Sequence, residues 1–136
     1  MRAQRIRNTL ENEKGQSLVE FALVVPLLLL LVIGVAEFGR AWMTQNILTG
    51  AAREAVRLLA VPAPAGGVAV AGDRATEVLA SAGISTASVV VTDNSAFEAV
   101  RVTITYNFPV TIAGFIPGLG NATIPLSSTT TMRREY

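Results

Sequence analysis

The feature that most constrains this chain is an uncharged apolar run near its N-terminus, which reads FALVVPLLLLLVIGVA from Phe21 to Ala36. With Leu18, Val19 and Phe38 the apolar segment reaches about 20 residues, roughly the length that an α-helix needs to cross the hydrocarbon core of a bilayer. The mean hydropathy of +0.47 is high for a soluble protein and agrees with such a segment. The sequence therefore predicts a transmembrane helix over about residues 18–38.

The basic residues around the apolar run predict its orientation. Four lie before the run and three lie within about 20 residues after it: Arg2, Arg5, Arg7 and Lys14, then Arg40, Arg53 and Arg57. This excess predicts a single-pass protein of the cytoplasmic membrane with a cytoplasmic N-terminus and an extracytoplasmic C-terminal domain. We do not expect removal as a secretory signal, because the run is long and Glu37-Phe38-Gly39-Arg40 offers no A-x-A-like cleavage site.

The composition excludes most catalytic and metal-binding classes. The chain has no cysteine and no histidine, which rules out disulfides, thiolate or imidazole metal sites and Cys–His or Ser–His catalysis. The acidic residues have no metal-ligand spacing and no basic phosphate-binding loop is present, so we expect no enzyme activity, metal or cofactor. From residue 16 onward seven arginines face eight acidic residues, which argues against nucleic-acid binding.

A carboxylate at the start of the apolar segment needs an explanation. Glu20 lies five residues after Gly15, and an ionised carboxylate at the bilayer centre costs ~2.5–3.5 kcal/mol. In one interpretation a peptidase cuts after Gly15, and the new ammonium of Gln16 and the Glu20 carboxylate pair with opposite charges of neighbouring subunits. In the other, Glu20 is a solvated acid at headgroup level, favoured by the helix dipole. These residues alone leave both interpretations open.

The segment GQSLVEFALVVPLLLLLVIGVAEFGRAW resembles the N-terminus of TadE-like pseudopilins, minor pilin-like proteins of the tight-adherence branch of the type IV pilus machinery. The later segments AAREAVR and TMRRE are similar to that family's layout as well. The resemblance implies that Gly15 precedes the scissile bond of a prepilin peptidase, that Gln16 becomes the mature N-terminus and that Glu20 is the fifth-position glutamate. It also implies four partners: the peptidase, other pilin-like subunits, the pilus assembly platform and the lipid bilayer.

The helix is predicted to continue beyond the membrane to about residue 61. Apolar residues recur on one face at spacings of three, four or their sums: Phe38, Ala41, Leu48, Ala52, Ala55, Val56 and Leu59. Arg53, Glu54 and Arg57 are interpreted as a solvated face. Trp42 follows the apolar run at the position of an interfacial anchor. Pro62, Pro64 and Gly66-Gly67 predict the end of the helix and a linker over residues 62–71.

Residues 72–136 predict a small α+β head. Asp73 can cap a short helix and Gly83 can end it. Strands are expected at Ser88–Thr92, Val100–Phe108 and Ala122–Met132, with a turn at Asp93-Asn94-Ser95. The second strand alternates strictly between apolar and polar residues, which indicates one buried and one wet face.

An apolar, uncharged loop over residues 109–120 separates the last two strands. In one interpretation its large side chains fold over the small core. In the other, Phe115, Ile116 and Leu119 contact another subunit or the outer leaflet, since exposed apolar patches mark interaction surfaces.

The predicted fold class is α+β: a long N-terminal transmembrane helix that anchors an extracytoplasmic domain with one short helix and an antiparallel sheet of about three strands. The leader 1–15 is expected to be cleaved, residues 16–61 form the long helix and residues 72–136 form the head. The resemblance implies a minor pilin-like subunit of a tight-adherence pilus, with a structural or assembly role in filament initiation or at the tip. The alternative is a monomeric membrane-anchored binding or sensor module.

Overall fold

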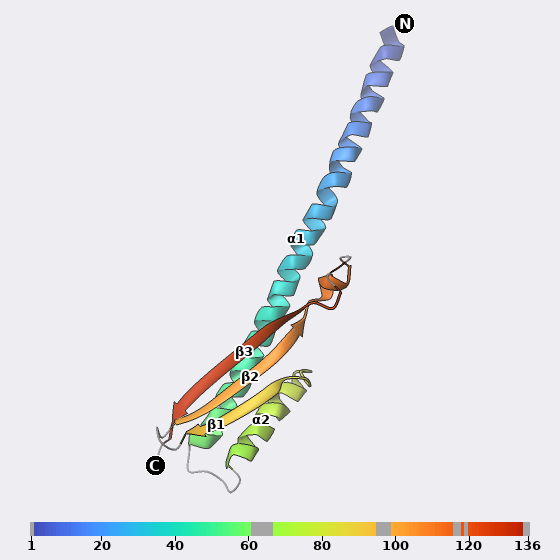
Figure 1. Ribbon diagram of the computed structural model, residues 1–136. Coiled ribbons are helices and arrows are strands. Elements are labelled where there is room, and N and C mark those ends of the chain that lie inside the picture. The colour runs from blue at the N-terminus through green and yellow to red at the C-terminus, as the bar shows by residue number, and fades with distance from the viewer. Residues whose placement is uncertain (1, 61–66, 95–98, 116–117, 119, 135–136) are drawn as a thin grey trace. The chain divides into compact units, whose positions relative to one another are not determined.

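The fold is α+β, as predicted. The computed structural model describes residues 2–60, 67–94, 99–115, 118 and 120–134 (Figure 1). In chain order the elements are the helices α1 (Arg2–Ala60) and α2 (Gly67–Ser81), the strands β1 (Ser88–Asn94) and β2 (Ala99–Pro109), the 3-10 helix η2 (Thr111–Phe115) and the strand β3 (Thr123–Arg133). They form two compact units, Met1–Glu37 and Phe38–Tyr136.

The first unit consists of α1 alone. This helix begins at Arg2 rather than near residue 16, because the leader contains three arginines, two glutamates and a lysine, which are good helix formers, and no proline. It contains Pro26 without an interruption of the assigned helix. Among the described residues one helix, from Gly15 onward, is long and apolar enough to cross a membrane, with a mean hydropathy of 2.8. This finding agrees with the predicted transmembrane segment.

In the second unit, α1 supplies one face of a closed core. The buried residues follow each other at spacings of three and one: Leu48, Ala51, Ala52, Ala55, Val56, Leu59 and Ala60. The prediction of this face is right from Leu48 onward and wrong at Phe38, which is 68% exposed. The reason is that Arg40 and Gln45, rather than Phe38, reach the strands at this end of the unit.

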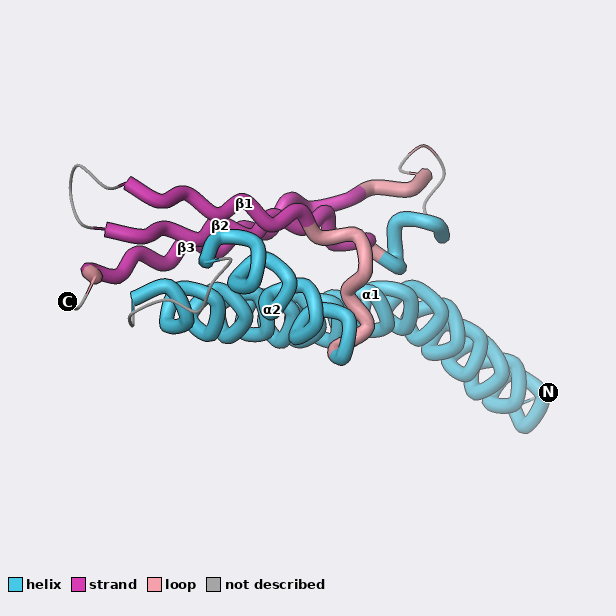
Figure 2. The backbone as a smooth tube through the Cα atoms, turned by 90° about the horizontal axis from the view of Figure 1, so that it is seen from below, coloured by secondary structure: helices cyan, strands magenta, loops and turns pink. Residues whose placement is uncertain are grey.

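The sheet has the order β1-β2-β3, and both pairs are antiparallel. Figure 2 shows the three strands in one layer, with α2 and the α1 segment of this unit on the same side. On β2 the predicted alternation is confirmed, since Val100, Val102, Ile104 and Phe108 are buried against the helices. The opposite face is rich in hydroxyl groups, including the cross-strand pair Thr103 and Thr129.

The strand β1 is longer than predicted, whereas β2 and β3 are close to their predicted bounds. β1 runs to Asn94, which pairs with Ala99, so the predicted turn at Asp93-Asn94 is wrong. Asp93 forms an ion pair with Arg134, which compensates the charge of an acid within a strand. β2 and β3 each lie within one residue of the predicted bounds.

The start of α2 also corrects the sequence interpretation. Residues 67–71, predicted as linker, are helical, and Asp73 lies inside the helix instead of capping it. The earlier start adds Ala71 to a stripe that continues with Ala75 and Leu79 at steps of four, so the extra turn is held by core packing. The predicted hinge at Pro62, Pro64 and Gly66 lies outside the described residues.

The end of α2 is as predicted. Gly83 has a φ of 78°, the left-handed conformation that glycine adopts without strain. The amide of Gly83 donates to the Ala80 carbonyl and the amide of Ile84 donates to the Leu79 carbonyl, each at 2.9 Å. These two bonds form a Schellman motif, and Leu79 and Ile84 are both buried in the core.

Polar contacts fix β3 along α1. The Gln45 side-chain amide donates to the backbone carbonyl of Ser127 at 2.8 Å. The Ser128 hydroxyl donates to the Thr49 hydroxyl at 3.1 Å, and Thr49 in turn donates to the Gln45 carbonyl at 2.9 Å. Because β3 is an edge strand, the Gln45 contact occupies a carbonyl that would otherwise be available to another chain.

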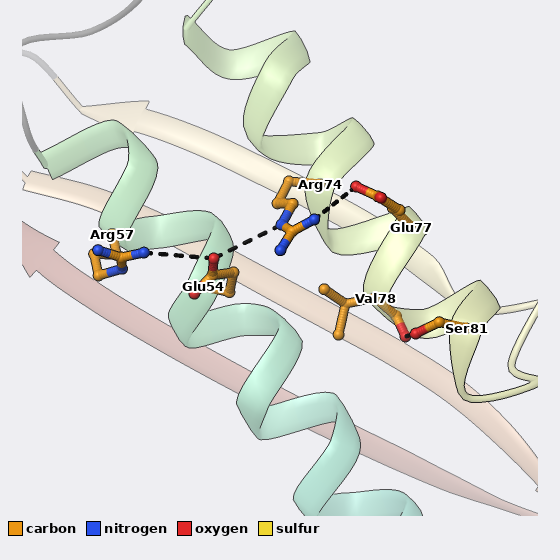
Figure 3. Close-up of polar contacts among 6 residues, drawn as sticks. All are labelled: Glu54, Arg57, Arg74, Glu77, Val78 and Ser81. Atoms are coloured by element: carbon orange, nitrogen blue, oxygen red, sulfur yellow. Dashed lines mark hydrogen bonds and ion pairs between the residues drawn. The ribbon is translucent and has the colours of Figure 1, made fainter.

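Ion pairs connect α1 with α2 (Figure 3). Glu54 lies 3.5 Å from the Arg57 guanidinium and 3.7 Å from that of Arg74, which also contacts Glu77 at 2.8 Å. The hydrogen bond from Arg74 to the Glu77 carboxylate raises the pKa of Arg74. Arg57 is solvated as predicted, whereas Glu54 joins two helices. Exposed pairs contribute little to stability, so these contacts orient α2 more than they hold it.

The packing predicts different effects for two valines on opposite faces of the sheet. Val102 is fully buried, and Val102→Ala should lower the free energy of unfolding by about 1–3 kcal/mol. Val90 is 55% exposed, and Val90→Ala should change it by less than about 0.5 kcal/mol. Urea-dependent proteolysis of the full chain in detergent micelles measures both. Equal effects of the two substitutions would contradict the assignment of the core face.

Candidate functional site

The predicted processing and assembly residues all lie on α1, in the first unit. Gln16 and Glu20 are four residues apart and therefore share a helix face. The Gln16 side-chain amide donates to the Glu20 carboxylate at 3.4 Å, and both residues are exposed. The helix thus places the carboxylate one turn from residue 16.

Gly15 is the weak point of the helix beside this pair. Glycine lowers helix stability by ~1 kcal/mol relative to alanine, so the backbone opens more easily there than at its neighbours. The residue is exposed, and no described side chain lies within 4 Å of the position that its Cβ would occupy. A larger residue at position 15 would therefore test recognition by a peptidase without disturbing packing inside the chain.

Among the described residues, none covers the apolar run of α1. Its large side chains from Leu18 to Val35 are exposed on all sides of the helix, for example Leu27 at 74%. A helix that is apolar all round is stable only in lipid or between other helices. This surface therefore requires an environment outside the chain.

The predicted loop contact is described only in part. Ile116 and Leu119 lie outside the described residues, as does the side chain of Phe115. The backbone of Thr111–Phe115 forms η2, which the sequence did not predict. Its Ala113 is 2% exposed, and the Ala113 amide donates to the Val110 carbonyl at 3.2 Å. The loop thus folds onto the core at Ala113.

Arg40 connects α1 with this loop, and sequence reasoning gave it no role. Its guanidinium donates to the Thr111 hydroxyl at 2.6 Å and lies 5.2 Å from the centroid of the buried Phe108 ring. Stacking of a cation on an aromatic ring adds to the hydrogen bond. On the same end of the unit, the exposed rings of Phe38 and Trp42 lie 6.2 Å apart. The signal in the sequence was only the mixture of aromatic and basic residues directly after the apolar run.

Over the described part of the chain, no three acidic side chains gather closely enough to hold a metal ion. The arrangement offers instead an uncovered apolar helix, a carboxylate at the start of that helix, and a small head with exposed rings at one end. These features are typical of a structural or membrane-anchoring protein.

The comparison with family models concerns the N-terminal part of the chain. Residues 15–57 match the family described as TadE-like protein. This segment is TadE-like. The match begins at Gly15, includes Gln16, Glu20 and the apolar run, and continues along α1 to Arg57. It confirms the resemblance that the sequence indicates.

TadE-like proteins are pilus-related structural proteins of tight-adherence systems, and the similarity of this chain to them covers residues 15–57. The apolar helix within the matched segment is long enough to cross a membrane. No match was found among curated proteins or among solved structures.

Proposed function

We propose that this TadE-like chain is a minor pilin-like subunit of the tight-adherence pilus, with a structural or assembly role in filament initiation or at the tip. One observation carries the proposal. The family match contains an apolar helix that its own chain leaves exposed, and Glu20 lies on that helix one turn from Gln16.

The exposed apolar helix can be buried in two different environments, first the membrane and then the filament. In the membrane, lipid covers the apolar side chains of residues 18–38. In a filament, the same side chains pack against the helices of other subunits, where van der Waals contacts replace lipid contacts. A chain that can exchange one cover for the other fits a subunit that leaves the bilayer during assembly.

Glu20 supplies the register in this proposal. A carboxylate surrounded by apolar helices is stable only with a partner charge. Cleavage after Gly15 would create an ammonium on Gln16, and a neighbouring subunit would present that ammonium to Glu20. The pair would then form only at one axial offset between the helices.

A monomeric anchored binding or sensor module remains the second candidate, because the unit Phe38–Tyr136 has a closed core of its own. Such a module needs neither cleavage nor a partner for Glu20. Cleavage after Gly15 and a requirement for Glu20 in assembly distinguish the pilin-like subunit from this module. Both candidates share the membrane anchor.

The topology prediction is that residues 67–134 lie outside the cytoplasm. The basic leader keeps the N-terminus inside, so external protease should degrade this region in intact spheroplasts. An epitope at the C-terminus reports the digestion. Protection before lysis, with digestion only afterwards, would reverse the proposed orientation.

The processing prediction is that a prepilin peptidase removes residues 1–15. Intact-mass measurement of the protein from its native host should show a chain that begins at Gln16. Gly15→Leu should abolish the cleavage, because a bulky residue would occupy the position before the scissile bond. Gly34→Leu is the matched control, since Gly34 is also in α1 with open space around it. A native product that retains the leader would refute the processing step.

The assembly prediction is that Glu20→Gln is inserted and cleaved normally but fails to co-purify with other pilins. Removal of the charge lowers the cost of insertion but leaves the Gln16 ammonium of a neighbour unpaired, at several kcal/mol in a dry site. Glu37→Gln, at the opposite end of the apolar run, is the control and should co-purify. Normal co-purification of Glu20→Gln would favour the solvated, passive role of this acid.

A further inference from the structure

Five residues on three elements lie at the end of the second unit that contains Phe38. We call them the basal surface: Phe38, Arg40, Trp42, Ile112 and Ile124. Phe38 and Trp42 lie one turn apart on α1 and are 68% and 63% exposed. Ile124, at the start of β3, is 49% exposed and pairs in register with Phe108. Ile112, on η2, is half-buried.

Arg40 holds these elements together. It stacks on Phe108, the β2 partner of Ile124, and donates to Thr111, the first residue of η2. In Figure 1 the short orange coil of η2 lies at the ends of β2 and β3 beside α1, as this contact requires. The exposed side chains of α1 and β3 and the half-buried Ile112 of η2 therefore belong to one end of the same unit.

We propose that the basal surface rests in the phospholipid headgroup region of the outer leaflet. The inference depends on the anchoring part of the proposed function and not on incorporation into a pilus. Phe38 ends the predicted span, and Trp42 follows four residues later, about 6 Å further along a helix. That distance places Trp42 at headgroup level when residues 18–38 span the hydrocarbon.

The side chains have the chemistry of that layer. Tryptophan is enriched at membrane–water interfaces, and arginine keeps its charged end in water while its stem covers apolar surface. Phe38, Ile112 and Ile124 add apolar area. Glu37 precedes Phe38 in the sequence, and its negative charge offsets the positive charge of Arg40. Binding of the surface to lipid therefore does not require anionic headgroups. Apolar contact with a zwitterionic bilayer is the interaction that this composition favours.

The single tryptophan of the chain makes Trp42 a selective probe. The full chain is placed in nanodiscs of phosphatidylcholine at one copy per disc, with and without lipid brominated near the headgroup end of its chains. Trp42 emission should be blue-shifted and quenched by the brominated lipid, at low and at high salt alike. Water-like, unquenched emission would overturn the proposal.

A second probe tests η2 itself, and the absence of cysteine from the chain allows single labels. Ile112→Cys and Thr129→Cys receive the same polarity-sensitive fluorophore, Thr129 being exposed on the opposite face of the sheet. Only the label at position 112 should shift to the blue in single-copy discs. A shift that occurs only with several copies per disc would show that another subunit occupies the surface, which refutes the lipid contact.

Arg40→Gln then separates the basal surface from general membrane proximity. Loss of the Thr111 bond and the Phe108 stack should release η2, so the label at position 112 shifts back to the red. Arg101→Gln, on the outer face of the sheet, removes the same charge and should leave the label unchanged. Urea-dependent proteolysis checks that both variants remain folded. A folded Arg40→Gln variant with an unchanged label would contradict the role of Arg40.

Discussion

The environment of this protein is determined by an apolar helix segment that the described residues of its own chain do not cover. Exposed in water, the side chains from Leu18 to Val35 would cost ~25 cal/mol for each Å² of apolar surface. No strand or second helix of the chain contacts them in the unit Met1–Glu37, so far as its residues are described. Lipid or other helices must supply the cover, and in the proposed function those helices belong to other pilin-like subunits.

The same helix changes character once it enters the second unit. From Leu48 its buried face is dominated by alanine, and Ala51, Ala52 and Ala55 bring the backbone close to the sheet. One end of this contact is held by polar side chains, Arg40 on Phe108 and Gln45 on the edge carbonyl of Ser127. The helix α1 thus combines an exposed apolar segment, which needs contacts outside the chain, with a segment that completes the core of the second unit.

The predictable features were those encoded by local pattern. The alternation along β2 indicated its buried face, and Gly83 indicated the left-handed end of α2. The missed features depend on residues far apart in the chain. β1 continues through Asp93, whose charge is balanced by the ion pair with Arg134. The helix α2 begins early because Ala71 packs into the core. For the site, the sequence and its resemblance to TadE-like proteins point to Gly15, Gln16 and Glu20, whose roles stay predictions. Arg40 acquires its contacts only through Thr111, 71 residues away.

The most direct test of the central claim asks what covers the apolar helix in the native host. A photo-crosslinking residue at position 27, where Leu27 is 74% exposed, samples its immediate surroundings. The account predicts covalent adducts with other pilin-like subunits in piliated cells and their loss in cells without the assembly platform. Lipid adducts alone in both kinds of cell would contradict it and identify the chain as a solitary membrane-anchored protein.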